Sequence, residues 1–340
     1  MYDWGRDRRV KWASVLGASI AIGALLVMTT LTANGAIRSP LRPSLAANAD
    51  PTSCTVGVGP LGPGYDPVTH DIYVLNSGSD NISVLNGACK VIGTVNLPSG
   101  ADPQQATFDP RYNYMEVTDS AQNQVYQISG TTIVNTIRGF HSPFGIAYDP
   151  ACHVAIGILG CTVVANGAGT TVETLSGVSF PVGAEPEGLA YDSFWDTVVV
   201  ANSASDNVTV LNAETLASVA NVGVGTEPDG VAFDPADSED YVTNFGSNNV
   251  TVLGGSAGPG GIDGWITGFD EPTGVAWDQS NLHIYVSNLG LGKVFELSGL
   301  SIVKKESTAK GSEAYGLAYD EATDEMFVAS SNTNVVYIIS

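Results

Sequence analysis

Residues 228–253 contain three segments: Pro-Asp-Gly-Val-Ala-Phe-Asp-Pro at 228–235, Tyr-Val-Thr-Asn at 241–244 and Asn-Val-Thr-Val-Leu at 249–253. In the first segment, small and polar residues alternate with large apolar ones, and the later segments are rich in Val and Thr. Asp, Ser, Asn and Gly, which favour turns, lie between the segments. The stretch therefore predicts consecutive β-strands joined by turns.

The same unit recurs along the chain with a nearly constant period. Its most regular marker is an aspartate after an aromatic residue, with proline six positions earlier in six copies and alanine in the seventh. The seven aspartates, 40 to 44 residues apart, are Asp66, Asp109, Asp149, Asp192, Asp234, Asp278 and Asp320. A unit of about 42 residues holds four strands, which is the size of a propeller blade. The sequence therefore predicts an all-β, seven-bladed β-propeller over residues 53–340.

Two details of this propeller follow from the repeat. The chain ends at Ser340 directly after the third strand of the last unit, and the segment 53–59 precedes the first unit. We therefore expect 53–59 to supply the missing strand of blade 7, which removes an exposed sheet edge. The aspartate of each unit is expected to be structural, because its carboxylate can accept backbone N–H groups of the following turn.

Blades 2 and 3 depart from the repeat. Gln105 replaces the glycine of Pro-x-Gly in blade 2. In blade 3, the segment Ala155–Ile158 is interpreted as the second strand, without the terminal Asn found elsewhere. The glycine-rich segment 258–261 is interpreted as a flexible insertion in a strand connection.

The signature Tyr-Val-Thr-Asn at 241–244, with Tyr-Val-Leu-Asn at 73–76 and Tyr-Val-Ser-Asn at 285–288, resembles the YVTN β-propeller repeat family. The Pro-x-Gly-Val-Ala-x-Asp-Pro lead fits the same family. The resemblance covers residues 53–340. It implies seven-bladed propellers that are often extracytoplasmic and are frequent in archaeal surface-layer and other secreted proteins. It does not imply one chemistry.

Residues 1–36 are predicted to be a membrane anchor or a signal peptide. Four basic residues between positions 6 and 11 precede an apolar segment, 13–33. This segment is long enough to span a bilayer and longer than a usual signal-peptide core. The small-x-small site at 47–49 keeps cleavage open as the alternative. The basic residues place the N-terminus in the cytoplasm and the propeller outside, either anchored by the N-terminal helix or secreted. Residues 37–52 are predicted to be a linker.

The propeller segment is strongly acidic. The whole chain has 13 Lys and Arg and 35 Asp and Glu, and the first 49 residues hold six of the basic and two of the acidic residues. The remainder therefore carries a net charge of −26. Such a domain repels phosphate groups, which excludes nucleic acid as a partner.

The connections that lead into the first strand of each unit carry repeated carboxylates around the proline. In a propeller these connections ring one mouth of the central channel, and carboxylate oxygens are the ligands that Ca²⁺ prefers. We therefore expect this ring to bind Ca²⁺ or another divalent cation, or else to form a solvated acidic rim. The candidate ligands are Glu185, Glu187, Glu227, Asp229, Asp270, Glu271 and Glu313.

Covalent modification is predicted at two kinds of residue. Sequons begin at Asn81, Asn207 and Asn249, which predicts N-glycosylation of an exported protein, unless the repeat itself selects Asn and Ser or Thr there. Four cysteines allow three disulfide pairings. Cys152 and Cys161 are the candidate pair, and their pairing requires an irregular blade 3, because an extended strand would hold them about 30 Å apart.

Enzyme signatures are weak in this sequence. The four histidines lie at non-equivalent points of the repeat, and the chain lacks Gly-x-Ser-x-Gly and His-Glu-x-x-His. The first hypothesis is a non-enzymatic surface or binding module whose partners are other surface proteins or glycans. The alternative is a metal-dependent lyase or lactonase-type propeller, since one fold supports many functions.

Overall fold

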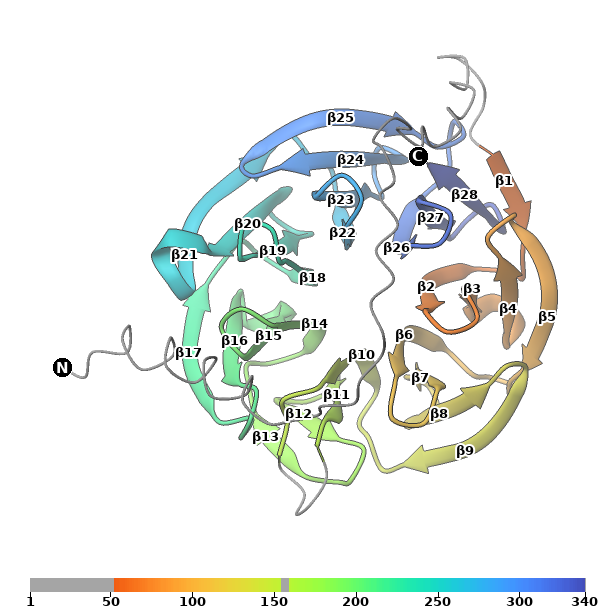
Figure 1. Ribbon diagram of the computed structural model, residues 1–340, viewed down its shortest axis with the longest axis horizontal. Coiled ribbons are helices and arrows are strands. Elements are labelled where there is room, and N and C mark those ends of the chain that lie inside the picture. The colour runs from red at the N-terminus through yellow and green to blue at the C-terminus, as the bar shows by residue number, and fades with distance from the viewer. Residues whose placement is uncertain (1–51, 154–158, 340) are drawn as a thin grey trace, which may run out of the picture. The chain divides into compact units, whose positions relative to one another are not determined.

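The computed structural model describes residues 52–339 except 154–158. These residues form seven four-stranded antiparallel sheets around one axis (Figure 1). The prediction of an all-β, seven-bladed propeller is confirmed. The predicted N-terminal anchor and nearly all of the linker lie outside the described residues. Within the described part of the chain, no helix has the length and apolar character needed to cross a bilayer.

In each of the first four blades the strands follow chain order from the axis outward (Figure 1). Their bounds are β2 (Pro60–Asp66), β3 (Asp71–Asn76), β4 (Asn81–Asn86) and β5 (Lys90–Asn96) in blade 1; β6 (Pro103–Asp109), β7 (Tyr114–Asp119), β8 (Gln124–Ser129) and β9 (Thr132–Arg138) in blade 2; β10 (Pro143–Asp149), β11 (Cys161–Asn166), β12 (Thr171–Thr174) and β13 (Ser179–Pro181) in blade 3; and β14 (Pro186–Asp192), β15 (Thr197–Asn202), β16 (Asn207–Asn212) and β17 (Ser218–Gly223) in blade 4.

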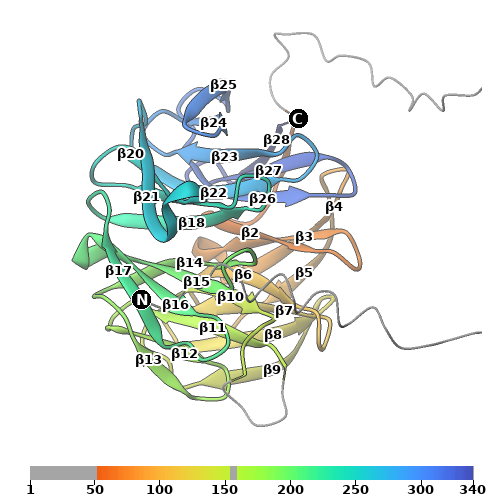
Figure 2. The same ribbon diagram turned by 60° about the vertical axis from the view of Figure 1, so that its left-hand side comes forward.

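Blades 5 to 7 continue the ring, which Figure 2 shows turned by 60°. Their strands are β18 (Pro228–Asp234), β19 (Glu239–Asn244), β20 (Asn249–Gly254) and β21 (Gly258–Thr267) in blade 5; β22 (Pro272–Asp278), β23 (His283–Asn288), β24 (Lys293–Ser298) and β25 (Ser301–Ser307) in blade 6; and β26 (Ala314–Asp320), β27 (Glu325–Ser330), β28 (Val335–Ile339) and β1 (Thr52–Thr55) in blade 7. Three one-turn 3-10 helices lie at Ser77–Ser79, Ser203–Ser205 and Gly255–Ala257.

The outermost strand of blade 7 comes from the start of the described chain. β1 pairs antiparallel with β28, with Thr52 opposite Ile338 and Thr55 opposite Val335. The strand spans 52–55 rather than 53–59, and the following residues lead into blade 1. A disulfide joins Cys54 to Cys89 in the β4–β5 turn, so blade 7 and blade 1 are also linked covalently.

The Tyr-Val-Thr-Asn signature holds neighbouring strands and blades together. Thr243 Oγ1 donates a hydrogen bond to the carbonyl oxygen of Thr273 in the next blade at 2.6 Å. Asn244 Nδ2 donates to Asn249 Oδ1 and Thr251 Oγ1 on the adjacent strand at 2.8 and 2.9 Å. Val242 is fully buried between blades 4 and 5. Tyr241 donates a hydrogen bond from its hydroxyl to the carbonyl oxygen of Gly299 at 3.2 Å, so each signature residue is explained by a structural contact.

The repeated aspartate has the structural role expected of it. In all seven blades its Oδ1 atom accepts the backbone N–H of the second residue after it, at 2.7–2.9 Å. Each of these carboxyls is buried. The interpretation as a turn-forming residue, without a catalytic role, fits this geometry in every blade.

Blade 3 differs from the expectation. Its second strand is Cys161–Asn166, which pairs with β10 and β12, so the assignment of this second strand to 155–158 was wrong. Residues 154–158 lie outside the described residues. Blade 3 does carry the terminal Asn, at Asn166. The segment 258–261, expected to be a flexible insertion, is the beginning of β21.

Candidate functional site

The Pro-x-Gly turns bring the innermost strands into close contact around the axis. A Cβ atom at Gly145 or Gly188 would collide with the backbone carbonyl oxygen of Glu187 or Asp229 on the next innermost strand. Only glycine tolerates this approach. The middle residue of the motif therefore lies in a ring at the axis, composed of Leu61, Gln104, Phe144, Glu187, Asp229, Thr273 and Tyr315.

A cavity of about 150 Å³ lies on the axis at this ring. Residues from all seven innermost strands line it, and most of them are apolar or glycine. Its polar lining residues are Gln104, Gln105, Asp229, Thr273 and Tyr315. A concave, largely apolar cavity with a few polar groups is typical of small-molecule binding sites.

Asp229 lines this cavity, and the charge of its carboxyl acts on the carboxyl of Glu187. Glu187 on β14 and Asp229 on β18 occupy equivalent positions of neighbouring blades, and both are half-buried. Burial raises the pKa of both carboxyls, and the nearby Asp229 carboxylate raises the pKa of Glu187 further. Because two close carboxylates in a poorly solvated site repel each other, the pair retains a proton more readily than exposed carboxyls do.

Tyr315 faces the same two carboxyls from blade 7. Burial raises the pKa of Tyr315 above its ordinary range, and the charges of Asp229 and Glu187 raise it further. These three side chains come from blades 4, 5 and 7, so their interaction crosses the channel. The phenol stays neutral at physiological pH and can donate a hydrogen bond.

The other predicted ligands remain on the rim of the channel mouth. Glu185, Glu227 and Glu271 have left-handed backbone conformations, with φ of 51°, 50° and 53°. Their carbonyl oxygens accept N–H groups of the adjoining turns at 2.9–3.0 Å. Glu313 is exposed and accepts a hydrogen bond from Ser331, and Asp270 is half-buried.

The described residues contain no group of three or more His, Cys, Asp or Glu side chains that could hold a metal ion. The structure brings Glu187 and Asp229 together but does not gather the predicted ring into one multidentate centre. Sequence reasoning missed Gln104, Phe144, Thr273 and Tyr315. They could have been found from the repeat, because they occupy the same position of Pro-x-Gly as the two carboxyls.

The part of the sequence around this site has acidic residues but no basic ones. Residues 139–292 contain 18 Asp and Glu and no Lys or Arg. This stretch, here called the acidic arc, includes blades 3, 4 and 5 and the inner half of blade 6. Glu187 and Asp229 therefore have no Lys or Arg on blades 3, 4 and 5 or on the inner half of blade 6 to neutralise them.

The three sequon asparagines participate in the contacts between strands. The Oδ1 atoms of Asn81, Asn207 and Asn249 accept hydrogen bonds from the terminal Asn of the preceding strand at 2.8–2.9 Å. The sequon hydroxyls of Ser83, Thr209 and Thr251 accept from the same amides at 2.9–3.0 Å. These sequons therefore serve the repeat structurally, and glycosylation stays a prediction.

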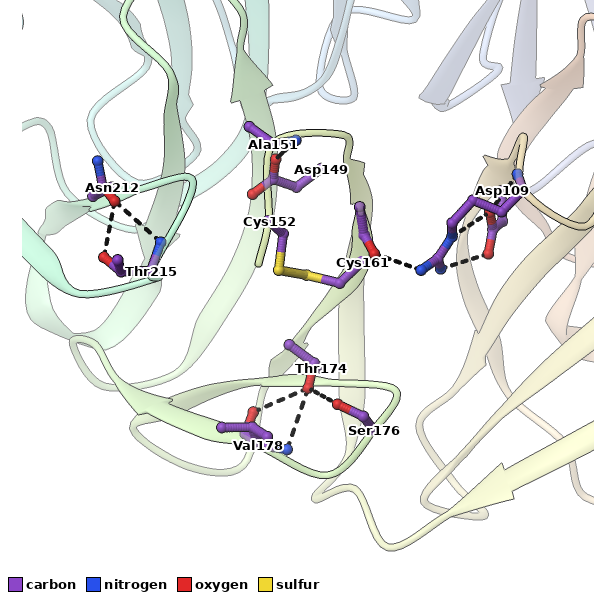
Figure 3. The surroundings of a disulfide bond; sticks show 12 residues. Asp109, Asp149, Ala151, Cys152, Cys161, Thr174, Ser176, Val178, Asn212 and Thr215 are labelled. Carbon is purple, nitrogen blue, oxygen red and sulfur yellow. Dashed lines mark hydrogen bonds and ion pairs between the residues drawn. A yellow bond between two sulfur atoms is a disulfide. The ribbon is translucent and has the colours of Figure 1, made fainter. Parts of the chain in front are cut away.

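The disulfides lie away from the channel mouth. Cys152 and Cys161 are joined, with 5.5 Å between their Cα atoms, and close the connection between β10 and β11 (Figure 3). Next to this bridge, Arg111 of blade 2 donates to the carbonyl oxygen of Gly160 and pairs with Asp109 at 2.7 Å. The Cys54–Cys89 pairing was not predicted, because it depends on the position of β1 in the closed ring.

Comparison with known proteins shows the fold alone. No family model matches the chain, and no curated protein matches it. Among solved structures, a streptogramin B lyase aligns with a TM-score of 0.71 and 12% identity over 85% of this chain and 96% of its own. Virginiamycin B lyase from Staphylococcus aureus aligns with a TM-score of 0.71 and 14% identity over 85% and 98%. A catalytically inactive histidine-to-alanine variant of the same enzyme, with quinupristin, aligns with a TM-score of 0.69 and 15% identity over 84% of this chain and 98% of its own.

Proposed function

We propose that this chain is a YVTN-type binding propeller that takes a small organic cation at the mouth of its central channel. The observation that carries the proposal is the Glu187–Asp229 pair, of which Asp229 lines an axial cavity, with no Lys or Arg in the surrounding arc. Buried carboxyls without a cationic partner are costly, and a bound cation removes that cost.

The lining of the cavity favours an organic cation over a metal ion. Ca²⁺ takes six to eight oxygen ligands, more than two carboxyls and a phenol supply. An alkylammonium ion needs one or two carboxylates and an apolar or aromatic wall, which Phe144, Leu189 and Tyr315 provide. Ca²⁺ or another divalent cation, expected from the sequence, therefore becomes the competing ligand in the test.

Proton release is the measurement that tests this site most directly. Because burial and mutual repulsion favour retention of a proton by the Glu187–Asp229 pair, binding of a cation at neutral pH should expel that proton. Calorimetric titration of the full chain with alkylammonium and polyamine salts, in two buffers of different ionisation enthalpy, should give buffer-dependent heats. CaCl₂ titrated under the same conditions tests the metal alternative.

Substitutions at the pair locate the binding site. Glu187→Gln and Asp229→Asn should each weaken binding of the ammonium probe at least tenfold and abolish proton release. Asp237→Asn, at an exposed carboxyl in the β18–β19 turn, should leave both unchanged. Ammonium binding that persists in Glu187→Gln with unchanged proton release would overturn the proposal.

The proposed setting is extracytoplasmic, with the chain anchored by its N-terminal segment or secreted. Two disulfides favour an oxidising compartment, and the acidic surface suits an exposed protein. Partners there would be other surface proteins or glycans. Intact-mass measurement of membrane and secreted fractions of the native producer tests anchoring and cleavage. The mass also reports any glycan at Asn81, Asn207 or Asn249.

A lyase is the second candidate function. It is favoured by the likeness to the three lyase structures and by a carboxyl pair that could exchange protons with a substrate. Against it, none of the four histidines lines the cavity, whereas a histidine-to-alanine variant of the Staphylococcus enzyme is described as inactive. Incubation with quinupristin tests it: conversion lost in Glu187→Gln would favour the lyase over the binding module.

A further inference from the structure

Blade 2 departs from the rule that places glycine third in each innermost strand. The other six blades have glycine there, and a Cβ atom on any of them would collide with a carbonyl oxygen of the next innermost strand. These glycines are Gly62, Gly145, Gly188, Gly230, Gly274 and Gly316. Blade 2 has Gln105 at this position, so the chain keeps a long polar side chain where the fold favours none.

The backbone contacts around Gln105 are nevertheless those of a blade with glycine. Its N–H group donates to Thr118 Oγ1 at 3.1 Å, and that hydroxyl donates to the carbonyl oxygen of Phe144 in blade 3 at 2.7 Å. In blade 5, Gly230 and Thr243 make the equivalent hydrogen bonds at 2.8 and 2.6 Å. Glutamine therefore changes the side chain at this point of the axis and keeps the contact between the blades.

Within the described residues, the carboxamide of Gln105 has no role in holding the strands together. Gln105 is half-buried and lines the axial cavity. The hydrogen bonds found for it in the described part of the chain are those of its backbone N–H and carbonyl groups. Its carboxamide is therefore available to a bound molecule, to which it can both donate and accept a hydrogen bond.

Gln104 adds a second carboxamide to the cavity on the same blade. Its Nε2 atom donates to the carbonyl oxygen of Asp102 at 3.3 Å and to Ser120 Oγ at 3.2 Å, which holds the side chain in place. Gln104 is buried and lines the cavity. Among the described residues, none of those that line the cavity is Lys or Arg. The ligand group that binds on blade 2 is therefore expected to be neutral, because a carboxylate would find no cation there.

Blade 2 lies across the channel from Asp229. The seven innermost strands contact one another in sequence around the ring, so blades 2 and 5 have the largest separation that a ring of seven allows. β6 and β18 accordingly lie on opposite sides of the axis (Figure 1). Gln105 and Asp229 both line the cavity. A molecule that contacts both therefore needs a cationic group at one end and a neutral hydrogen-bonding group at the other.

We propose that Gln105 is a specificity-determining residue of the channel site, and that the ligand is an ammonium compound with a hydroxyl or amide group at its other end, such as an amino alcohol. This proposal rests on the organic-cation site proposed above. The ammonium group binds to the Glu187–Asp229 pair, and the polar end exchanges hydrogen bonds with the Gln105 carboxamide. An analogue without the polar end binds more weakly, because it leaves a half-buried amide without a partner.

Two pairs of nearly isosteric probes test the role of Gln105. Ethanolamine is compared with propylamine, and aminopentanol with hexylamine, so that the members of each pair differ by a hydroxyl in place of a methyl group. In calorimetric titration of the full chain, the amino alcohol of at least one pair should bind about fivefold more tightly than the alkylamine. Gln105→Met, which keeps the length of the side chain, should abolish this preference. Gln105→Gly, which introduces the residue of the other six blades, should abolish it as well.

Two further variants separate this proposal from the one on which it rests. Glu187→Gln should weaken binding of both members of a pair by a similar factor and keep the preference for the hydroxyl. Gln279→Met, at an exposed glutamine in the β22–β23 turn, should leave both affinities unchanged. Equal affinities within both pairs, or a preference that survives in Gln105→Met, would overturn the role of Gln105 and leave the organic-cation site in place. Absence of binding by all four amines would overturn both proposals.

Discussion

The ring consists of two arcs that differ in charge, and the repeated buried aspartate has different partners in one blade of each arc. In the mixed arc, formed by residues 52–138 and 293–339, Asp109 pairs with Arg111 at 2.7 Å. In the acidic arc, the equivalent Asp192 receives only backbone N–H groups, and burial raises its pKa. Both carboxyls are fully buried. At equal burial, the two carboxyls therefore differ in their partners, because among the described residues Asp109 has a guanidinium and Asp192 has only backbone N–H groups.

The disulfides offer the largest test of this comparison, because each arc holds one. Replacing Cys54 and Cys89 with Ala should lower the free energy of unfolding by about 4 kcal/mol, since the bridge closes a loop of 35 residues. Replacing Cys152 and Cys161, which are nine residues apart, should cost about 2.5 kcal/mol. Guanidinium unfolding of both double variants measures the difference.

Comparison of the two disulfide variants also tests how the ring is closed. The longer loop begins at Cys54 on β1, the strand that pairs with β28, so loss of this disulfide should also expose the edge of blade 7 to exchange. Hydrogen exchange should therefore increase at β28 in the Cys54/Cys89 variant and remain unchanged there in the Cys152/Cys161 variant. Equal decreases in the free energy of unfolding would mean that the junction of blades 7 and 1 depends on its disulfide no more than blade 3 does.

The ion pair of the mixed arc gives the next largest effect. Arg111→Met should lower the free energy of unfolding by about 3 kcal/mol, because it leaves the buried Asp109 carboxylate without its cation. The variant also loses the hydrogen bond to Gly160 and the contact with the Tyr148 ring. Arg138→Met, at an exposed arginine, should stay within about 0.5 kcal/mol of the parent. A similar loss in both variants would contradict the assigned pairing.

The fold could be predicted because each copy of the repeat is recognisable from its local sequence. Alternation and turn residues specify each strand, and the period of about 42 residues specifies the blade. The prediction of the second strand of blade 3 was wrong for a physical reason. The residues at 155–158 are apolar enough for a strand, but strand choice depends on pairing with β10, and Cys161–Asn166 makes that pairing.

The site could be predicted only in part. The acidic loops could be recognised in the sequence because they repeat. Which carboxyls meet depends on the direction of each side chain relative to the axis, and a loop pattern does not specify this. Glu187 and Asp229 lie inside the ring because they follow the proline, whereas Glu185 and Glu227 precede it and remain on the rim.

The dependence of stability on pH is the smallest and most distributed effect. Burial raises the pKa of Glu116 to about 7, of Asp149 to about 6 and of Glu239 to about 7. These groups bind protons more tightly in the folded state, so their stabilisation is complete below about pH 4 and is lost as the pH rises through 6 to 7. The full chain should therefore unfold at a higher temperature at pH 5 than at pH 8.

Glu116 shows whether the mixed arc contributes to this slope. Its Oε1 atom accepts a hydrogen bond from Gln127 at 2.7 Å, while Oε2 and the neighbouring Thr162 hydroxyl lack partners among the described residues. Glu116→Gln keeps the first contact and adds an N–H donor beside that hydroxyl. The variant should match the parent at pH 5 and exceed its stability by about 2 kcal/mol at pH 8. A parallel pH profile for parent and variant would assign the whole slope to the acidic arc.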